Sequence, residues 1–191
     1  MSRAGVGSDR LRRYILTGAP GAGKTAILRE LQARGWAVVG EAATDVIARG
    51  QARGVQEPWT DSDFISKIAA LQRHRQQQLV PTGTTVQFYD RSPWCTLALA
   101  RYMQLPVTPT LADEIARVSD EKIYQRTVFF VRPLGFIVPS AARRISYRDA
   151  LKFEAVHEAI YRAHGFDLVD VSAGEVEQRV ALIEVKLASE L

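Results

Sequence analysis

Short apolar runs alternate along the chain with longer segments in which apolar residues recur at helical spacing. The short runs predict five β-strands, at about residues 12–17, 36–40, 84–89, 127–131 and 166–171. The longer segments predict helices at about 24–34, 42–49, 61–79, 93–103, 110–118, 149–163 and 175–191. Strands that alternate with helices form a parallel sheet covered by helices on both faces. The pattern therefore predicts a three-layer α/β fold with a five-stranded parallel sheet.

Two stretches fall outside this alternation. Residues 1–10 are small and polar and contain glycine, a composition typical of a disordered tail. Residues 133–148 are irregular and basic, and we expect them to form a small lid. Because a chain of 191 residues suits one domain with a hydrophobic core, we assign residues 11–191 to a single domain that includes this lid.

Composition and charge narrow the class of protein. Hydrophobic residues make up 47% of the chain and charged residues 24%, as in ordinary globular proteins. Of the net charge of +4, residues 1–13 contribute +3, so the rest of the chain carries no strongly basic face that would suit nucleic acid. The single cysteine, Cys95, excludes an intrachain disulfide. Without a bilayer-spanning apolar run or a signal-peptide pattern, we expect a cytoplasmic location.

Residues 18–25 read Gly-Ala-Pro-Gly-Ala-Gly-Lys-Thr and match every fixed position of the phosphate-binding pattern G-x-x-x-x-G-K-[ST]. They lie between the first predicted strand and the first predicted helix, which is the context the motif requires. Glycines let backbone N–H groups surround an anion, and the helix N-terminus adds partial positive charge. Lys24 can reach the outer phosphates, while the Thr25 hydroxyl can bind magnesium. We therefore predict that the chain binds ATP and Mg²⁺. The residues assigned to the nucleotide are Gly18, Ala19, Pro20, Gly21, Ala22, Gly23, Lys24, Thr25 and Ala26.

Further polar residues follow the other predicted strands, at the edge of a parallel sheet where ligands bind. Glu41 follows the second strand, Asp90, Arg91 and Ser92 follow the third, and Arg132 follows the fourth. Phosphoryl transfer needs magnesium held by an acid, a residue that orients or deprotonates the acceptor, and cations for the transferred charge. Together with the phosphate loop, these strand ends offer all three.

These motifs resemble those of small P-loop kinases. The phosphate loop, Glu41, a strand that closes in Tyr-Asp-Arg-Ser and an arginine-containing segment before the last strand carry the resemblance. In particular, the chain resembles compact bacterial AAA-domain ATPases that are grouped with nicotinamide-riboside kinase domains and lie near nucleoside and nucleotide kinases. The resemblance spans about residues 13–186. It implies the strand order 2-3-1-4-5 and a nucleotide-kinase-like fold.

The resemblance also implies roles for individual residues. In deoxynucleoside kinases a glutamate after the second strand acts as base on the acceptor hydroxyl, and Glu41 stands at that place. Those enzymes carry Glu-Arg-Ser after the third strand, where this chain has Asp90-Arg91-Ser92. By this likeness Asp90 would bind magnesium through water, and Arg91 would contact a substrate phosphate or hydroxyl.

Two further roles follow from the same likeness. A glutamine on the third helix reads a base in those kinases, and Gln72 is the nearest candidate, although Gln76, Gln77 and Gln78 lie on the same segment. The lid arginines would be Arg143, Arg144 and Arg148. The expected catalytic residues are Lys24, Glu41, Asp90, Arg91, Arg144 and Arg148, and the expected metal ligands are Thr25 and Asp90.

Several of these residues have a structural alternative. Glu41 and Asp90 each precede a predicted helix and could serve as its N-terminal cap. Arg91 could pair with surface acids, and the three lid arginines could form a solvated helix face. Trp59 could stack on an acceptor ring or anchor its own loop.

The histidines and the cysteine receive structural assignments. His74, His157 and His164 lie in helical patterns without metal-ligand spacing, so we expect surface or core positions. Cys95 is expected to be a small packing residue.

Two classes of function fit these predictions. The first is a phosphotransferase that moves the γ-phosphoryl of ATP to a nucleoside-, nucleotide- or metabolite-like small molecule. The second is an ATPase or nucleotide-dependent switch without an acceptor. The expected partners are a nucleoside triphosphate and an unidentified small acceptor, with no membrane.

Overall fold

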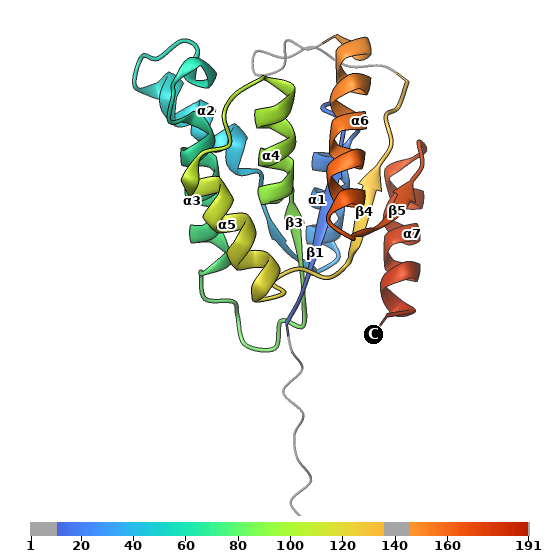
Figure 1. The fold of residues 1–191 in the computed structure, drawn as a ribbon. Helices are drawn as coiled ribbons and strands as arrows, with labels where there is room; N and C mark the ends of the chain where they lie inside the picture. Colours follow the sequence, from blue (N-terminus) through green and yellow to red (C-terminus); the bar gives the residue numbers. More distant parts are fainter. Residues whose placement is uncertain (1–10, 136–145, 191) are drawn as a thin grey trace, which may run out of the picture.

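The computed structural model describes residues 11–135 and 146–190. Five parallel strands form one sheet in the order β2-β3-β1-β4-β5 (Figure 1). Their bounds are β1 Arg12–Gly18, β2 Ala37–Val39, β3 Val86–Asp90, β4 Thr127–Val131 and β5 Asp167–Val171. The predicted fold class and strand order are therefore confirmed.

The strand register brings the carboxyl ends of the three central strands to the same edge of the sheet. Leu16 of β1 is level with Asp90 of β3, and Gly18 of β1 is level with Val131 of β4. All five residues of β4 are buried, as expected for a parallel strand covered on both faces. Loops that leave this edge therefore start close together.

Helices cover the two faces of the sheet. Their bounds are α1 Lys24–Ala33, α2 Ala42–Ala52, α3 Phe64–Gln76, α4 Pro93–Tyr102, α5 Pro109–Asp120, α6 Tyr147–Ala163 and α7 Val176–Ala188, with a short 3₁₀ helix, η1, at Pro58–Thr60. The core on one face is built mainly from α1 and α7. The core on the other face is built from α2 to α6. The three-layer arrangement follows from these two cores.

Helix boundaries differ from the sequence predictions in three places. Residues 50–60, which separate two predicted helices, contain the end of α2 and the 3₁₀ helix η1. The third helix ends at Gln76, so Leu79 lies outside it and is fully exposed. Helix α6 begins at Tyr147, because the side chain of Ser146 accepts a hydrogen bond from the backbone N–H of Asp149 at 3.1 Å.

The early start of α6 changes the prediction of a lid at residues 133–148. Tyr147 and Arg148 belong to the first turn of α6. Arg143 and Arg144 lie outside the described residues, so their expected roles stay predictions. The predicted tail at 1–10 also lies outside them.

The two ends of the described chain lie together at the amino edge of the sheet (Figure 1). The Glu190 carboxylate accepts hydrogen bonds from Tyr14 Oη at 3.1 Å and Thr127 Oγ1 at 2.7 Å. The backbone carbonyl of Glu190 accepts another from the guanidinium of Arg12. The last described residue is thus joined to the starts of β1 and β4.

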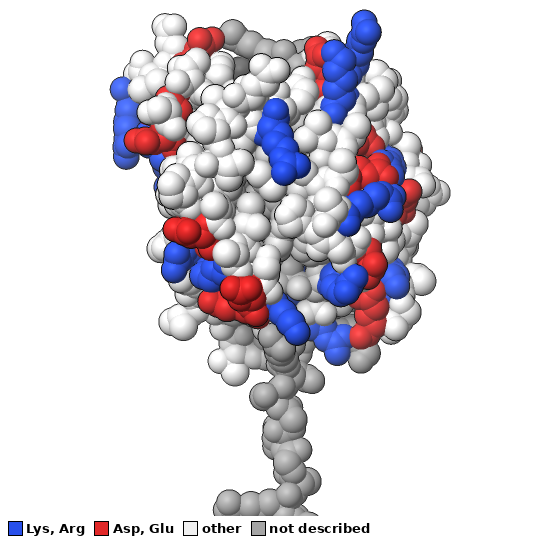
Figure 2. Space-filling model, viewed as in Figure 1, with Lys and Arg blue, Asp and Glu red and all other residues white. Residues whose placement is uncertain are grey.

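Surface charge agrees with the charge count. Figure 2 shows basic and acidic side chains interspersed on the face in view, with no continuous basic stripe among the described residues. Within the same residues, no helix combines the length and apolar character that crossing a bilayer requires.

Candidate active site

The phosphate loop follows β1 at the carboxyl edge of the sheet. Gly18 has a φ of 132°, and a Cβ there would lie 2.2 Å from the carbonyl oxygen of Val131. Gly23, with a φ of 90°, immediately precedes α1. Both positions require glycine, because a side chain would meet backbone or strain the turn. The backbone of the loop therefore lies at the N-terminus of α1, where backbone N–H groups can bind an anion.

Lys24 lies folded against this loop. Its Nζ donates hydrogen bonds to the carbonyl oxygens of Gly18 at 3.1 Å and Ala19 at 2.8 Å. Burial, and next the positive charge of Arg91, lower the pKa of Lys24 to about 8. The amino group of Lys24 is therefore mostly protonated at neutral pH, and it lies against the backbone of the phosphate loop.

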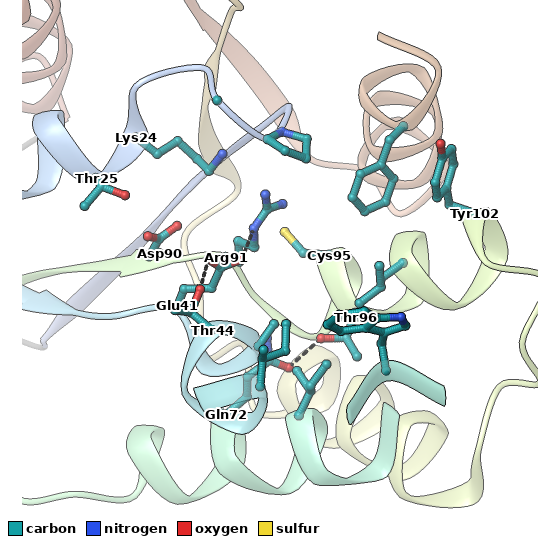
Figure 3. A pocket seen from close by; sticks show the side chains of 18 of the residues that line it. Lys24, Thr25, Glu41, Thr44, Gln72, Asp90, Arg91, Cys95, Thr96 and Tyr102 are labelled. Carbon is teal, nitrogen blue, oxygen red and sulfur yellow. Dashed lines mark hydrogen bonds and ion pairs between the residues drawn. The ribbon is translucent and has the colours of Figure 1, made fainter. Parts of the chain in front are cut away.

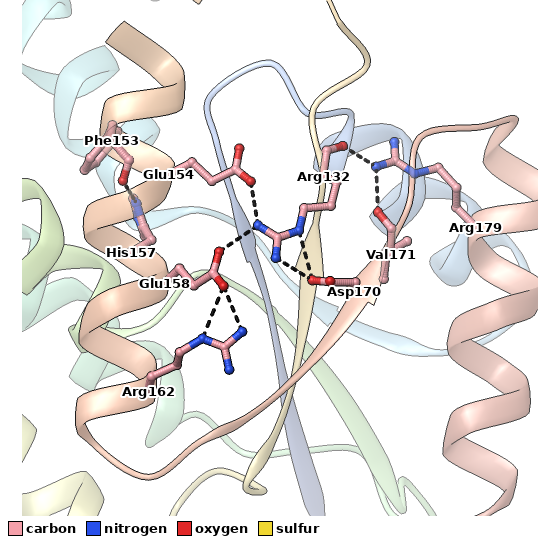
Figure 4. Close-up of polar contacts among 9 residues, drawn as sticks. All are labelled: Arg132, Phe153, Glu154, His157, Glu158, Arg162, Asp170, Val171 and Arg179. Atoms are coloured by element: carbon pink, nitrogen blue, oxygen red, sulfur yellow. Dashed lines mark hydrogen bonds and ion pairs between the residues drawn. The ribbon is translucent and has the colours of Figure 1, made fainter. Parts of the chain in front are cut away.

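Arg179 of α7 supports the loop from behind, a contact that the sequence did not predict. Its Nη1 donates to the carbonyl oxygen of Ala22 at 2.8 Å. Its Nη2 donates to the carbonyl oxygen of Arg132 at 2.8 Å, as Figure 4 shows. Arg179 is only 3% exposed. It thus connects the phosphate loop to the chain that leaves β4.

A cavity of about 1020 Å³ opens beside the loop. One end is lined by the phosphate loop and the start of α1, including Lys24 and Thr25. The other end, which we call the aromatic lobe, lies among α2, η1, α3, α4 and α6. Its apolar wall consists of Trp59, Phe64, Ile68, Leu99, Tyr102 and Phe153. Figure 3 shows Glu41 and Arg91 between the two ends.

Glu41 occupies the N-cap position of α2 but makes no side-chain hydrogen bond to the helix backbone. Its Oε1 instead pairs with Nε of Arg91 at 2.6 Å, and its Oε2 accepts a hydrogen bond from Thr44 Oγ1 at 2.7 Å. Burial opposes ionisation of Glu41, but the charges of Arg91 and Lys24 outweigh it and lower the pKa. Glu41 is accordingly a carboxylate at neutral pH, and its contacts are not those of a helix cap.

Asp90 ends β3 and is 8% exposed. Ser92, not Asp90, occupies the N-cap of α4, so the capping alternative for Asp90 is wrong. Burial, and next the negative charge of Glu41, raise the pKa of Asp90 to about 6. Its Oδ1 is buried without a hydrogen-bond partner among the described residues. An unpaired buried carboxylate oxygen is suited to a cation.

The donors at this point fit magnesium. Thr25 and Asp90 offer oxygen atoms, which Mg²⁺ prefers, beside a loop suited to phosphates. The described residues contain no cluster of three or more His, Cys, Asp or Glu side chains that could hold a metal by themselves. Such a sparse protein contribution is typical of Mg²⁺ bound together with substrate phosphates.

Arg91 has a left-handed backbone with a φ of 71°, unusual for a residue other than glycine. Its backbone N–H donates to the carbonyl of Leu16 at 3.0 Å, which holds the turn against β1. Its Nη1 lies 3.0 Å from Nε2 of His157. His157, expected at the surface or in the core, is fully buried and contacts Arg91.

Gln72 is the glutamine of α3 that lines the cavity. Its Oε1 accepts a hydrogen bond from Thr96 Oγ1 at 2.9 Å. Gln76 is buried against Arg117, whereas Gln77 and Gln78 are exposed. Of the four candidates, Gln72 is therefore the one that lines the cavity.

Trp59 and Cys95 both line the cavity. Trp59 also packs against the core that α2 to α6 form, so its position is compatible with both roles considered for it. Cys95 is buried, and its Sγ lies 3.1 Å from both Thr17 Oγ1 and Tyr161 Oη. These contacts make it part of the floor between β1 and α6.

The arginines outside the cavity have other contacts. Arg132, expected near the triphosphate, does not line the cavity. Three carboxylates hold it between α6 and β5 (Figure 4): Glu154 and Glu158, each at 2.8 Å, and Asp170 at 2.7 Å. Arg148 is exposed and does not line the cavity either.

A parallel sheet with this loop at its carboxyl edge defines a P-loop nucleotide-binding protein. A family model described as an AAA domain matches residues 13–179, and the chain belongs to that family. No curated protein matches the chain.

Solved structures of deoxyadenosine kinase from M. mycoides are similar in fold. One holds the products dCMP and dCDP; it is 13% identical with a TM-score of 0.58, and the match covers 94% of this chain and 100% of that one. Another, with bound dCTP, is 14% identical with a TM-score of 0.59, and the match covers 93% of this chain and 99% of that one. The resemblance to P-loop nucleoside and nucleotide kinases is thereby confirmed at the level of the fold.

Proposed function

We propose that the protein transfers the γ-phosphoryl group of ATP to a hydroxyl of a small, ring-containing acceptor of the nucleoside type. The observation that carries this proposal is the two-ended cavity with Glu41 and Arg91 between the phosphate loop and the aromatic lobe. An ATPase needs space for the nucleotide and one water. A kinase needs a second compartment beside the γ-phosphate, and the aromatic lobe supplies it.

The residues divide the reaction among them. The acceptor oxygen forms a bond to the γ-phosphorus while the bond from that phosphorus to the bridging oxygen of ADP breaks. Glu41, which is ionised, receives the hydroxyl proton. Lys24 and Arg91 offset the negative charge on the transferred group. Mg²⁺ held by Thr25 and Asp90 would neutralise charge on the phosphates.

The aromatic lobe suggests how the acceptor is held. A flat ring would lie against side chains such as Trp59, Tyr102 and Phe153, where stacking and burial of apolar surface favour it. Gln72 can turn its amide toward polar atoms on the ring edge, since its NH₂ group donates and its oxygen accepts hydrogen bonds. The deoxyadenosine kinases of similar fold act on acceptors of this kind.

The test is to incubate the protein with Mg²⁺ and ATP and a panel of nucleosides, nucleotides, vitamins and aminoglycoside-like alcohols. We expect ADP release that depends on one class of nucleoside-like acceptor, with the phosphorylated acceptor identified by mass spectrometry. Glu41→Gln, which keeps the shape of the side chain, should lower single-turnover transfer by about a hundredfold. ADP release that no acceptor increases would instead support the ATPase or switch alternative.

A further inference from the structure

One face of α6 is directed at the turn formed by Asp90, Arg91 and Ser92. His157 contacts the guanidinium of Arg91, and Tyr161, one helical turn later, has its Oη 2.6 Å from Ser92 Oγ. Both α6 side chains are fully buried. The same helix contributes Phe153 to the aromatic lobe. Helix α6 is therefore the element that packs on the turn from the side opposite Glu41.

The hydrogen bonds define the state of His157. Its Nδ1 lies 2.9 Å from the backbone carbonyl of Phe153, which can only accept, so Nδ1 carries the proton (Figure 4). Nε2 then has a free lone pair and accepts a hydrogen bond from Nη1 of Arg91. Burial and the charge of Arg91 lower the pKa of His157 well below its usual value. The imidazole is neutral.

Because His157 is neutral, it can accept a hydrogen bond from Arg91 without changing the charge of the site. Glu41 holds Nε of the guanidinium, and His157 holds Nη1 from the other side. Because Glu41 already balances the single positive charge of Arg91, a second carboxylate at the place of His157 would give these side chains a net negative charge. The neutral imidazole fixes the direction of the guanidinium without adding a negative charge that would repel an incoming phosphoryl group.

We propose that His157 is a positioning residue that holds Arg91 in the orientation used during phosphoryl transfer. Without this contact, Glu41 alone would hold the guanidinium, through Nε, and the rest of the group could turn away from the reaction centre. This inference rests on the proposed function, because Arg91 acts on the transferred group.

The test compares two variants with a matched control. His157→Leu removes the acceptor for Arg91, while His157→Gln keeps an acceptor oxygen near the place of Nε2. The control is His164→Leu at the C-cap of the same helix: His164 has the same kind of bond, from Nδ1 to the carbonyl of Ile160 at 2.8 Å, but it is exposed and does not line the cavity. Steady-state kinetics, ATP binding by calorimetry and thermal unfolding are measured for each.

We expect His157→Leu to lower kcat at least tenfold while the ATP dissociation constant changes less than about threefold, as is typical when only transition-state interactions are lost. His157→Gln should recover most of kcat, and His164→Leu should behave like the unmodified protein. Unchanged kcat in His157→Leu would overturn the inference. The inference would also be overturned if kcat of His157→Leu fell in proportion to its melting temperature and His157→Gln did not restore kcat.

A second readout separates this inference from the proposed function. Nitrogen-15 NMR of labelled histidine should show His157 neutral, with the proton on Nδ1, at neutral pH. Its Nε2 signal should shift in Arg91→Gln. If the unmodified protein transfers no phosphate to any acceptor, the proposed function fails. If the Nε2 signal of His157 has the same chemical shift in Arg91→Gln as in the unmodified protein, the positioning contact is absent and the inference itself fails.

Discussion

Folding of the protein disfavours the ionised form of the Asp90 side chain. Its pKa of about 6 means that folding strengthens proton binding relative to the ordinary aspartate pKa of 3.8. The stability linked to this group is therefore fully present below about pH 4 and is lost as the pH rises through about 6. At neutral pH the buried charge beside Glu41 opposes folding, as is common for groups whose role is catalytic.

A substitution at Asp90 should therefore separate stability from activity. We expect Asp90→Asn to raise the free energy of unfolding at pH 7 by about 1–3 kcal/mol, because it removes a buried like charge, and to lower turnover at least a hundredfold. Denaturant unfolding and a transfer assay measure the two effects. Asp113→Asn, at an exposed position of α5, is the control. A destabilised Asp90→Asn protein with normal turnover would indicate a structural role.

The pKa values of Asp90 and Lys24 also predict the pH dependence of the reaction. Asp90 must be ionised to bind magnesium, so kcat/KM for MgATP should fall as the pH drops below about 6. Lys24 must be protonated to contact phosphate, so the same quantity should fall as the pH rises above about 8. Lys24→Arg should remove the alkaline limb, since arginine remains charged. A kcat/KM that stays constant from pH 5 to 9 would contradict both assignments.

At the scale of elements, α7 fixes the phosphate loop through Arg179. In Arg179→Met the carbonyl oxygens of Ala22 and Arg132 lose their buried donor, at about 1–3 kcal/mol for each group left unpaired. We expect a lower melting temperature together with at least tenfold weaker ATP binding, although Arg179 does not line the cavity. Gln178→Met, exposed on the same helix, should change neither quantity. Normal ATP binding in Arg179→Met would show that the loop keeps its shape without α7.

The sequence predicted the elements better than the contacts between them. Apolar periodicity located each strand to within a few residues, because buried parallel strands are short continuous apolar runs. The phosphate loop was found because its glycines and lysine are adjacent in the chain. The contact between Arg91 and His157 joins residues 66 positions apart, and no periodic pattern encodes it. Arg132 was misplaced for the same reason, since its three acidic partners come from α6 and β5.

One boundary was readable and was missed. Ser146 followed three residues later by Asp149 is a helix-start pattern, and it places the beginning of α6 inside the segment taken as the lid. Two lid arginines, Arg144 and Arg148, are expected catalytic residues. Arg144 lies outside the described residues, and Arg148 is exposed in the first turn of α6.

For the whole molecule, nucleotide binding should stabilise the fold. A ligand present at a hundred times its dissociation constant adds about 2.7 kcal/mol to the free energy of unfolding. For a domain of this size that amounts to a rise in melting temperature of about 5–10 °C. We expect this rise with MgATP and none with the same concentration in Lys24→Ala. An equal rise in both proteins would mean that ATP binds somewhere other than the phosphate loop.

The pairing of Glu190 with the starts of β1 and β4 has a practical consequence. Both ends of the described chain lie at the amino edge of the sheet (Figure 1). The cavity is lined by the phosphate loop and by Asp90 and Arg91, which lie at the carboxyl edge. A linker, a bead or a second enzyme attached at either end would therefore leave the mouth of the cavity facing outward. Immobilised in this way, the protein should retain the substrate affinity that it has in free solution.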